Sequence, residues 1–279
     1  MTVDHSLEAR GLSAGYGQRT VVADVDLALP PGRISVIVGA NACGKSTLLK
    51  TFARLLSPAA GAVLLDGERI DRTPTKRLAR TLGLLPQTSV APEGIAVADL
   101  VGRGRHPHQK LFRSWTADDE RAVAAALAAT GTAELADRAV DELSGGQRQR
   151  VWIAMALAQE TEVLLLDEPT TYLDLAHQIE VLDLVADLNR DRGTTIAMVL
   201  HDINLAARYA DHLFALRDGA LVASGPPSEV VSAELMRDVF GLDSTVIPDP
   251  VSGTPLILPH GRHHAPAAIP HAPTTGASA

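Results

Sequence analysis

The chain has 279 residues, a formal net charge of −8, 46% hydrophobic residues and one cysteine, Cys43. This length allows one large domain or two small ones, and the acidic balance with only 3% aromatic residues argues against a surface that grips nucleic acid. One cysteine excludes an intramolecular disulfide, and no apolar run approaches the roughly 18 residues that a membrane span needs. We therefore expect a soluble protein that meets any membrane through a partner.

Three short apolar runs are typical of buried β-strands. They are RISVIVG (33–39), EVLLLDEP (162–169) and TTIAMVLH (194–201). KSTLLKTFARLL (45–56) predicts a helix after the first run, and apolar residues at helical spacing predict another helix between the second and third runs. Strands that alternate with helices predict an α/β fold with a mainly parallel sheet.

Other regions depart from this alternation. The first thirty residues hold short alternating segments broken by Gly and Pro, and predict antiparallel strands. Residues 90–142 are Ala-rich and helical in pattern, which predicts a helical insertion. Asp-Gly in ALRDGALVASG (215–225) predicts a hairpin. Residues 261–279, rich in Ala, Pro and His, predict a disordered tail.

The clearest chemical motif is GANACGKST (39–47), which fits G-x-x-x-x-G-K-[ST] between a predicted strand and a predicted helix. Backbone N–H groups in such a loop, and the helix start behind it, face phosphate oxygens. We expect Lys45 to reach the β- and γ-phosphates and the Ser46 hydroxyl to bind Mg²⁺, with Thr47 nearby. A glycine-rich turn without a ligand is the alternative, and the full match in its context disfavours it.

Two adjacent acids end the second apolar run. Asp167 is expected to bind Mg²⁺, directly or through water, and Glu168 to orient and deprotonate the attacking water. A solvated loop is the alternative for such a pair. Four apolar residues before the pair and a phosphate loop upstream favour the metal and catalytic roles.

The most basic stretch of the chain is VGRGRHPHQKLFRSW (101–115), whose cations are Arg103, Arg105, Lys110 and Arg113. No carboxylate lies within it. Such a cluster could grip nucleic acid, bind an anionic ligand or dock on a protein partner. The residues of this stretch alone do not decide among the three.

One segment carries a family resemblance. LSGGQRQR (143–150) lies between the phosphate loop and LLLDEP, and resembles the signature motif of ATP-binding cassette (ABC) ATPases. Other marks of that family are Gln87 in LLPQ, Asp174 in TTYLDL, His201 in VLHD and Tyr16 in GYG. The resemblance covers residues 6–258. It implies a P-loop NTPase (RecA-like) core with an N-terminal antiparallel β subdomain and an α-helical subdomain inserted at about 88–150.

The same resemblance implies roles for single residues. In the phosphate loop, ATP is expected to be contacted by Gly39, Asn41, Gly44, Lys45, Ser46 and Thr47. Tyr16 is expected to stack on the adenine. Gln87 touches Mg²⁺ and the attacking water, and His201 contacts the γ-phosphate beside Glu168. The nucleotide of the opposing subunit is contacted by Ser144, Gly145, Gly146 and Gln147, and Asp174 crosses the dimer interface. Independently, Ser144 is a plausible N-cap for the helix that follows.

Because each site needs a phosphate loop from one subunit and a signature from the other, the resemblance implies a homodimer.

Three segments look like the subgroup that imports iron–siderophore complexes: TTYLDLAHQIEVLDLV, GRGRHPHQ and VIPDPVSGTPLILP (246–259). We expect two transmembrane permease subunits, an extracytoplasmic binding protein, no nucleic acid, and a peripheral position at the cytoplasmic face of the inner membrane. Vitamin B12 or haem import is the alternative, and a soluble nucleic-acid- or ribosome-associated ATPase is a remote one. The basic stretch is then interpreted as a docking surface for the permease.

Many relatives have Pro and Gly where this chain has Ala40 and Ala42. Because Gly39 and Gly44 are intact, we expect little loss of loop function. Ala42 is expected to adopt a backbone conformation that a residue with Cβ accepts.

Overall fold

The structure is a computed structural model, which describes residues 5–109 and 115–261. Within these residues, no helix is both long and apolar enough to cross a membrane. The predicted disordered tail lies outside the described residues except for Gly261, and Lys110 and Arg113 of the basic stretch lie outside them as well.

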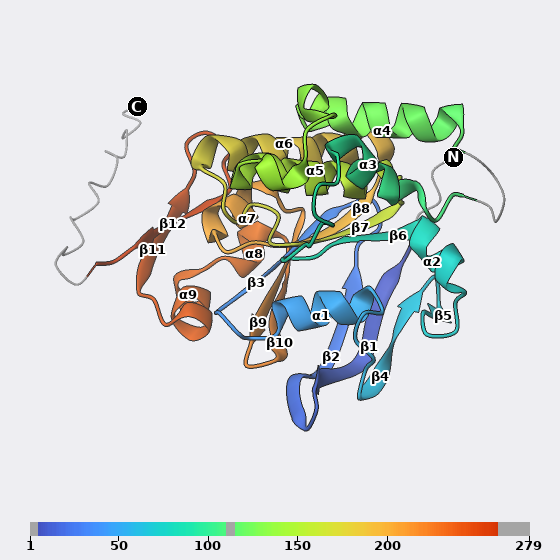
Figure 1. The fold of residues 1–279 in the computed structure, drawn as a ribbon. Coiled ribbons are helices and arrows are strands. Elements are labelled where there is room, and N and C mark those ends of the chain that lie inside the picture. Colours follow the sequence, from blue (N-terminus) through green and yellow to red (C-terminus); the bar gives the residue numbers. More distant parts are fainter. Residues whose placement is uncertain (1–4, 110–114, 262–279) are drawn as a thin grey trace, which may run out of the picture.

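The centre of the described fold is a mainly parallel sheet of six strands (Figure 1). Its order is β10 (Ala220–Gly225), β9 (His212–Arg217), β3 (Ile34–Gly39), β8 (Thr195–Val199), β7 (Val163–Asp167) and β6 (Leu82–Leu85). Only the edge strand β10 runs antiparallel to its neighbour. All residues of β3, β7 and β8 are buried, because both faces of the sheet are covered. The three predicted core strands are confirmed.

A second sheet is antiparallel throughout, in the order β2 (Arg19–Leu29), β1 (Leu7–Tyr16), β4 (Ala60–Leu65) and β5 (Glu68–Arg69). Helix α1 (Lys45–Phe52) lies between this sheet and the parallel one, with Leu48, Leu49 and Phe52 fully buried. The antiparallel strands predicted for the first thirty residues are confirmed. The helix is shorter than predicted, because Arg54 adopts a left-handed φ of 59°.

Five further helices form one hydrophobic cluster with the opposite face of the parallel sheet (Figure 1). This layer holds α3 (Val97–Gly102), α4 (Ala117–Ala129), α5 (Gly145–Ala158), α6 (Leu175–Arg192) and α7 (Ile203–Tyr209). Successive side chains of a strand point to opposite faces of the sheet, so each strand contributes to the hydrophobic core on both sides. Along β7, Leu164 and Leu166 face the helical layer, while Val163 and Leu165 face α1 and the antiparallel sheet.

Short elements complete the described chain. They are α2 (Thr75–Thr81), α8 (Pro227–Val230), α9 (Ala233–Phe240) and the hairpin of β11 (Ser244–Pro248) with β12 (Pro255–Pro259). The hairpin packs on α7, where the Asn204 side chain donates to Ile257 O at 3.2 Å and accepts from Ile257 N at 2.7 Å. The hairpin predicted at 215–225 is confirmed by the antiparallel pair of β9 and β10.

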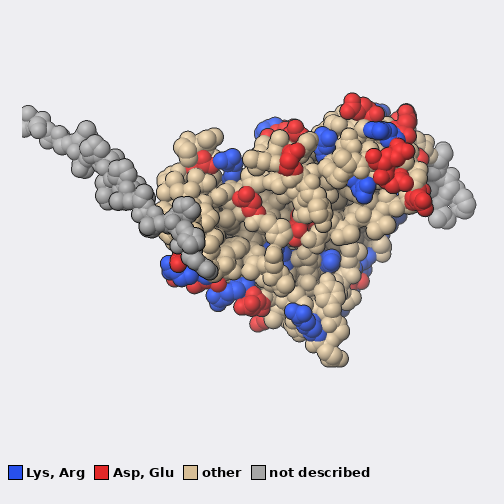
Figure 2. All heavy atoms as spheres, turned by 60° about the vertical axis from the view of Figure 1, so that its left-hand side comes forward, with Lys and Arg blue, Asp and Glu red and all other residues tan. Residues whose placement is uncertain are grey.

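Charge on the surface is mixed. On the face shown in Figure 2, acidic side chains gather toward one upper edge, and basic side chains are scattered among them and over the rest. A continuous basic belt would be needed to follow a nucleic-acid backbone, and this face does not offer one.

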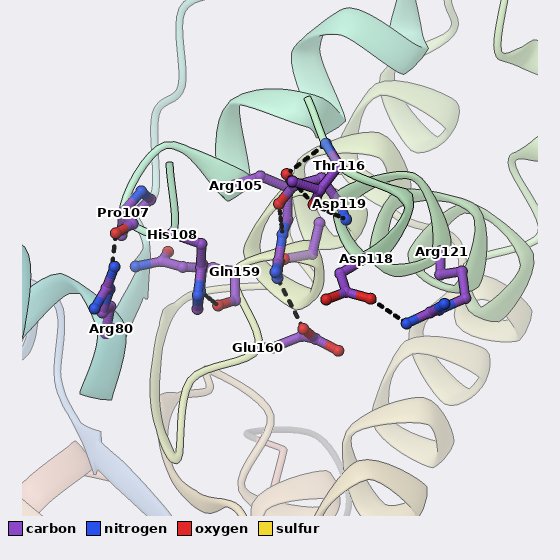
Figure 3. A network of polar contacts seen from close by, with 11 residues as sticks. Arg80, Arg105, Pro107, His108, Thr116, Asp118, Asp119, Arg121, Gln159 and Glu160 are labelled. Atoms are coloured by element: carbon purple, nitrogen blue, oxygen red, sulfur yellow. Dashed lines mark hydrogen bonds and ion pairs between the residues drawn. The ribbon is translucent and has the colours of Figure 1, made fainter. Parts of the chain in front are cut away.

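Arg105 corrects the interpretation of the basic stretch. Its side chain is buried and forms ion pairs with Asp119 at 3.0 Å and Glu160 at 2.8 Å (Figure 3). The carboxylates that neutralise it come from 14 and 55 residues further along the chain, so the local sequence gave no sign of them. Arg105 is therefore not a docking cation, whereas Arg103 is exposed.

Candidate functional site

The phosphate loop joins β3 to α1 and depends on glycine at two positions. A Cβ added to Gly39 would lie 2.3 Å from Leu216 O, and Gly44 has φ = 110°. Side chains would clash at the first position and be strained at the second. The loop therefore folds tightly against the neighbouring strand β9 and directs the start of α1 toward the cleft.

Ala42 corrects an expectation about this loop. It adopts φ = 62°, in the left-handed region, although it carries a Cβ. That conformation costs a residue other than glycine about 1–2 kcal/mol. The departure from glycine at this position therefore carries a cost in stability that we did not expect.

Lys45 is buried at the base of the loop. Its Nζ donates to Gly39 O at 2.8 Å and to Ala40 O at 2.9 Å, so the ammonium is held against the backbone of its own loop. The side chain also lines the cleft described below. A cation fixed here adds positive charge to the N–H groups at the start of α1.

Ser46 and Asp167, each predicted to bind Mg²⁺, are in contact although 121 residues separate them. The Ser46 hydroxyl donates to Asp167 Oδ1 at 2.8 Å. Asp167 Oδ2 is buried and has no hydrogen-bond partner among the described residues. Burial raises the pKa of Asp167, and the neighbouring Glu168 carboxylate adds to the rise, against the opposing hydrogen bond from Ser46.

This oxygen set fits a magnesium ion. Mg²⁺ prefers carboxylate and hydroxyl oxygens, and a bound cation would satisfy the buried Asp167 oxygen, for which the described part of the chain offers no partner. Among the described residues, no group of three or more His, Cys, Asp or Glu side chains could hold a metal by themselves. A metal here would accordingly need further oxygens, from water or from a bound nucleotide.

Glu168 is the point where three separate segments meet. Its Oε2 accepts from Gln87 Nε2 at 2.7 Å and from Thr171 Oγ1 at 3.1 Å, and its Oε1 lies 2.7 Å from His201 Nε2. Glu168 is buried, with a left-handed φ of 55° directly after β7. This turn directs the carboxylate toward Gln87 and His201, where it can accept a proton from a water molecule.

Gln87, Glu168 and His201 line one cleft of about 910 Å³. Its lining contains nine of the predicted site residues, namely Tyr16, Asn41, Gly44, Lys45, Ser46, Thr47, Gln87, Glu168 and His201. Tyr16 stands at the rim and is half exposed. An aromatic ring, a phosphate loop and a carboxylate therefore face one space large enough for a nucleotide.

The signature segment lies outside this lining. Ser144 caps α5 through a capping box: its hydroxyl accepts from Gln147 N at 3.3 Å, and the Gln147 side chain accepts from Ser144 N at 3.1 Å. The predicted N-cap is thus confirmed. Ser144 and Gly145 are exposed. The structure does not bring them, Gly146 or Gln147 to the cleft of the same chain.

Asp174 also lies away from the cleft. It caps α6 by accepting from His177 N at 3.0 Å, and its Oδ1 lies 2.7 Å from His177 Nδ1. The backbone hydrogen bond from His177 and then the His177 ring lower the pKa of Asp174. Its carboxylate therefore stays charged at neutral pH, on an exposed surface.

Comparison with known proteins decides the family. The family model described as "ABC transporter" matches residues 22–171. The chain belongs to the ABC transporter family. It is 56% identical over 257 residues to the achromobactin transport ATP-binding protein CbrD of Dickeya dadantii, covering 92% of this chain and 96% of that protein. It is 54% identical over 256 residues to the ferric enterobactin transport ATP-binding protein FepC of Escherichia coli, covering 92% and 94%.

A solved structure shares the fold of this ABC ATPase. The dimeric bacterial ABC transporter cassette MJ0796 superposes with a TM-score of 0.71 at 26% identity, over 79% of this chain and 98% of that one. The resemblance drawn from the motifs and the predicted fold class are both confirmed. The protein is an ATPase of the ABC type.

Three further residues of the ABC ATPase site escaped the sequence analysis. Arg19 and Val21 line the cleft beside Tyr16, and Thr171 donates to Glu168. Arg19 could have been found, because it follows Tyr16 by three residues and pairs with it across the β1–β2 turn. Thr171 lies three residues after Glu168, at the end of the turn in which Glu168 adopts a left-handed φ.

Proposed function

We propose that this ABC ATPase energises the uptake of a ferric siderophore across the cytoplasmic membrane. The observation that carries the proposal is the identity above 50%, over more than nine-tenths of each chain, to two ATP-binding proteins named for siderophore transport. The cargo class follows from this likeness, because no part of the cleft is expected to touch cargo. The proposed location is the cytoplasmic face of the inner membrane, where the chain is peripheral.

In the proposed reaction, ATP and water give ADP and phosphate. Glu168 takes a proton from the attacking water, since its carboxylate lies at the cleft and is oriented by Gln87 and Thr171. His201 lies beside the same carboxylate, and in this proposal it contacts the γ-phosphate. Tyr16 holds the adenine, and the phosphate loop with Lys45 holds the phosphates.

The metal proposed for this site is Mg²⁺, held by Ser46, Asp167 and Gln87 together with phosphate oxygens. Mg²⁺ would neutralise the charge that develops on the phosphates. The protein's own contribution is to keep Ser46 and Asp167 in contact, while the other Asp167 oxygen has no hydrogen-bond partner within residues 5–109 and 115–261.

The proposed working form is a homodimer. Ser144, Gly145, Gly146 and Gln147 would reach the nucleotide of the opposing subunit, with Asp174 at the interface. The absence of these residues from the lining of their own cleft, in the described part of the chain, supports this arrangement. In the proposed domain organisation, residues 6–258 form one nucleotide-binding unit with the helical subdomain at about 88–150.

Two transmembrane permease subunits are the proposed partners, and an extracytoplasmic binding protein would deliver cargo to them. We place the permease contact at the loop after Gln87 and at the exposed Arg103. Arg105 does not contribute to this contact, because its side chain is buried and forms an ion pair with Asp119.

The test is uptake of labelled ferric siderophores, haem and cobalamin by cells that lack this protein. We expect uptake of one or more ferric siderophores to fail and to return with the wild-type gene. Loss of cobalamin or haem uptake alone would overturn the proposal that the cargo is a ferric siderophore. Purification of the chain with RNA rather than with an integral membrane protein would overturn the transporter function.

A further inference from the structure

Arg105 joins three separate elements from one buried position. Its Nε donates to Asp119 Oδ1 at 3.0 Å, and its Nη1 donates to Ala158 O at 2.7 Å and Glu160 Oε2 at 2.8 Å (Figure 3). Both Arg105 and Asp119 are only 4% exposed. A buried charge is tolerated at low cost only when its partners are in place, and here they are.

The pair also lies where two helices end. Ala158 is the last residue of α5, whose C-terminal carbonyls attract a cation, and Asp119 lies in the first turn of α4, whose N–H groups attract an anion. Burial alone would raise the pKa of Asp119, but hydrogen bonds from Thr116 and Arg105 outweigh it and lower that pKa. The ion pair therefore fastens the end of α5 to the start of α4.

Gln159 makes a second attachment of the same helix end. Its Nε2 donates to Ala79 O of α2 at 2.6 Å, and its carbonyl lies 2.8 Å from His108 Nε2. Arg80, also in α2, donates to Pro107 O at 2.8 Å. Helix α2 runs directly into β6, which ends two residues before Gln87. The C-terminal end of α5 is thus tied to the element that leads to Gln87.

The motif GRGRHPHQ is explained by these contacts. A Cβ on Gly104 would lie 2.3 Å from Met155 O, so only glycine lets the turn at Arg103–Arg105 approach α5. Arg105, Pro107 and His108 then supply the attachments already described. We interpreted this motif from the sequence as a docking surface, but Arg105 is buried and His108 contacts Gln159 O, so only part of the motif, Arg103 and His106, is exposed.

The other end of α5 carries the signature and lies nearer the surface. Ser144 and Gly145 are exposed, and Gln149 Nε2 donates to Pro169 O at 3.0 Å. A helix of 14 residues is about 21 Å long, so a tilt of about 5° at the fixed end moves the signature by about 2 Å. A displacement of about 1 Å in a catalytic group can lower a rate by about 100-fold.

We propose that Arg105 and Gln159 are positioning residues for ATP hydrolysis. They fix the C-terminal end of α5 against α4 and α2, and thereby set where Ser144–Gln147 meet the nucleotide of the opposing subunit and keep that segment in line with Gln87. This inference rests on the proposed homodimer, in which the signature completes the partner's site.

The experiment compares Gln159→Glu and Arg105→Lys with wild type. Gln159→Glu keeps the shape of the side chain but removes the donor to Ala79 O. Arg105→Lys keeps the charge but cannot bridge Asp119 and Ala158 together. The matched control is Arg121→Ala, which removes the exposed ion pair with Asp118 on the same helix α4 (Figure 3).

Three quantities are measured for each full-length variant: kcat and KM for ATP hydrolysis, the Kd of a fluorescent ATP analogue, and ATP-driven dimerisation in a Glu168→Gln background. We expect kcat to fall about tenfold or more in both variants and ATP-driven dimerisation to weaken. The Kd of the analogue should stay within about twofold, because the cleft of each chain is untouched. Arg121→Ala should match wild type in all three.

An unchanged kcat in both folded variants would overturn the inference. So would a loss of kcat accompanied by an equal loss of analogue binding and a lower Tm, since that result would indicate a general structural role. Failure of wild type itself to hydrolyse ATP or to dimerise with ATP would instead contradict the proposed function. The two failures are therefore distinguishable.

Discussion

His201 Nε2 lies 2.7 Å from Glu168 Oε1, and the residues are 33 positions apart on the loops that follow β8 and β7. These strands are neighbours in the parallel sheet, so their carboxyl ends present both side chains at one edge. Gln87, which follows the next strand β6, reaches the other oxygen of Glu168. The order of the strands, rather than closeness in sequence, brings together the three residues of the proposed catalytic group.

Replacing Glu168 by Gln removes the proposed proton acceptor and keeps its shape. ATP hydrolysis should fall by about 100-fold or more, because general-base assistance contributes about 10²–10⁴ in rate. ATP binding should persist, since the phosphate loop is unchanged. Phosphate release and binding of a fluorescent ATP analogue measure the two effects. Glu162→Gln, on an exposed side chain before β7, is the control, and hydrolysis at the wild-type rate by Glu168→Gln would refute the assignment.

Asp167→Asn should raise the Mg²⁺ concentration needed for half-maximal hydrolysis about tenfold or more. An amide oxygen in place of the carboxylate removes a negative charge from the proposed metal site and leaves a buried N–H₂ group facing it. Titration of ATPase activity with MgCl₂ measures the change. An unaltered Mg²⁺ requirement would place the metal elsewhere.

Ala42→Gly should stabilise the protein by about 0.5–1 kcal/mol, because Ala42 adopts a left-handed φ that glycine accepts without strain. Denaturant unfolding of both proteins gives the difference in free energy. Ala40→Gly is the matched control, since Ala40 has no left-handed φ and glycine there only adds freedom to the unfolded chain. Equal effects of the two changes would show that strain at Ala42 is not the cause.

Asp249→Asn should lower the Tm at pH 7, because it breaks the pair with Arg208, whose Nη2 lies 2.6 Å from Asp249 Oδ2. The Arg208 guanidinium, and then the backbone N–H of Val251, hold the pKa of Asp249 well below its usual range. A depressed carboxyl pKa stabilises the folded state above the unfolded pKa of about 3.9, and that stabilisation is lost as the pH falls below it.

The difference in Tm between wild type and Asp249→Asn should accordingly shrink as the pH is lowered from about 4 toward the depressed pKa. Thermal melts from pH 7 downward measure it. Asp243→Asn, in the exposed pair with Arg237, should change the Tm little at any pH. A constant difference for Asp249→Asn across the series would be inconsistent with this account.

Arg103→Glu tests the exposed part of the basic stretch. Transport should fall, because reversing an exposed charge at an interface weakens association with the partner. The rate of ATP hydrolysis by the isolated chain should stay within about twofold of wild type. Arg105→Glu would instead place a third carboxylate beside Asp119 and Glu160, and should disrupt the fold. Full transport by the Arg103→Glu protein would remove this residue from the permease contact.

Motifs with local geometry were predictable from the sequence. The phosphate loop, the Ser144 cap and the Asp-Gly hairpin each depend on residues within a few positions of one another, so their patterns contain the necessary information. The environment of Arg105 depends on Asp119 and Glu160, which lie outside the basic stretch. The residues of that stretch alone therefore indicated only unpaired positive charge. The φ of Ala42 is imposed by the loop around it, against the preference of the residue itself.

In the proposed function, hydrolysis at Glu168 drives the import of a ferric siderophore. The most direct measurement is accumulation of labelled ferric siderophore in proteoliposomes that hold the complete transporter, with ATP hydrolysis followed in the same sample. We predict that wild type hydrolyses ATP and accumulates the label, and that Glu168→Gln does neither. Accumulation by Glu168→Gln, or hydrolysis by wild type without accumulation of any ferric siderophore, would contradict the account.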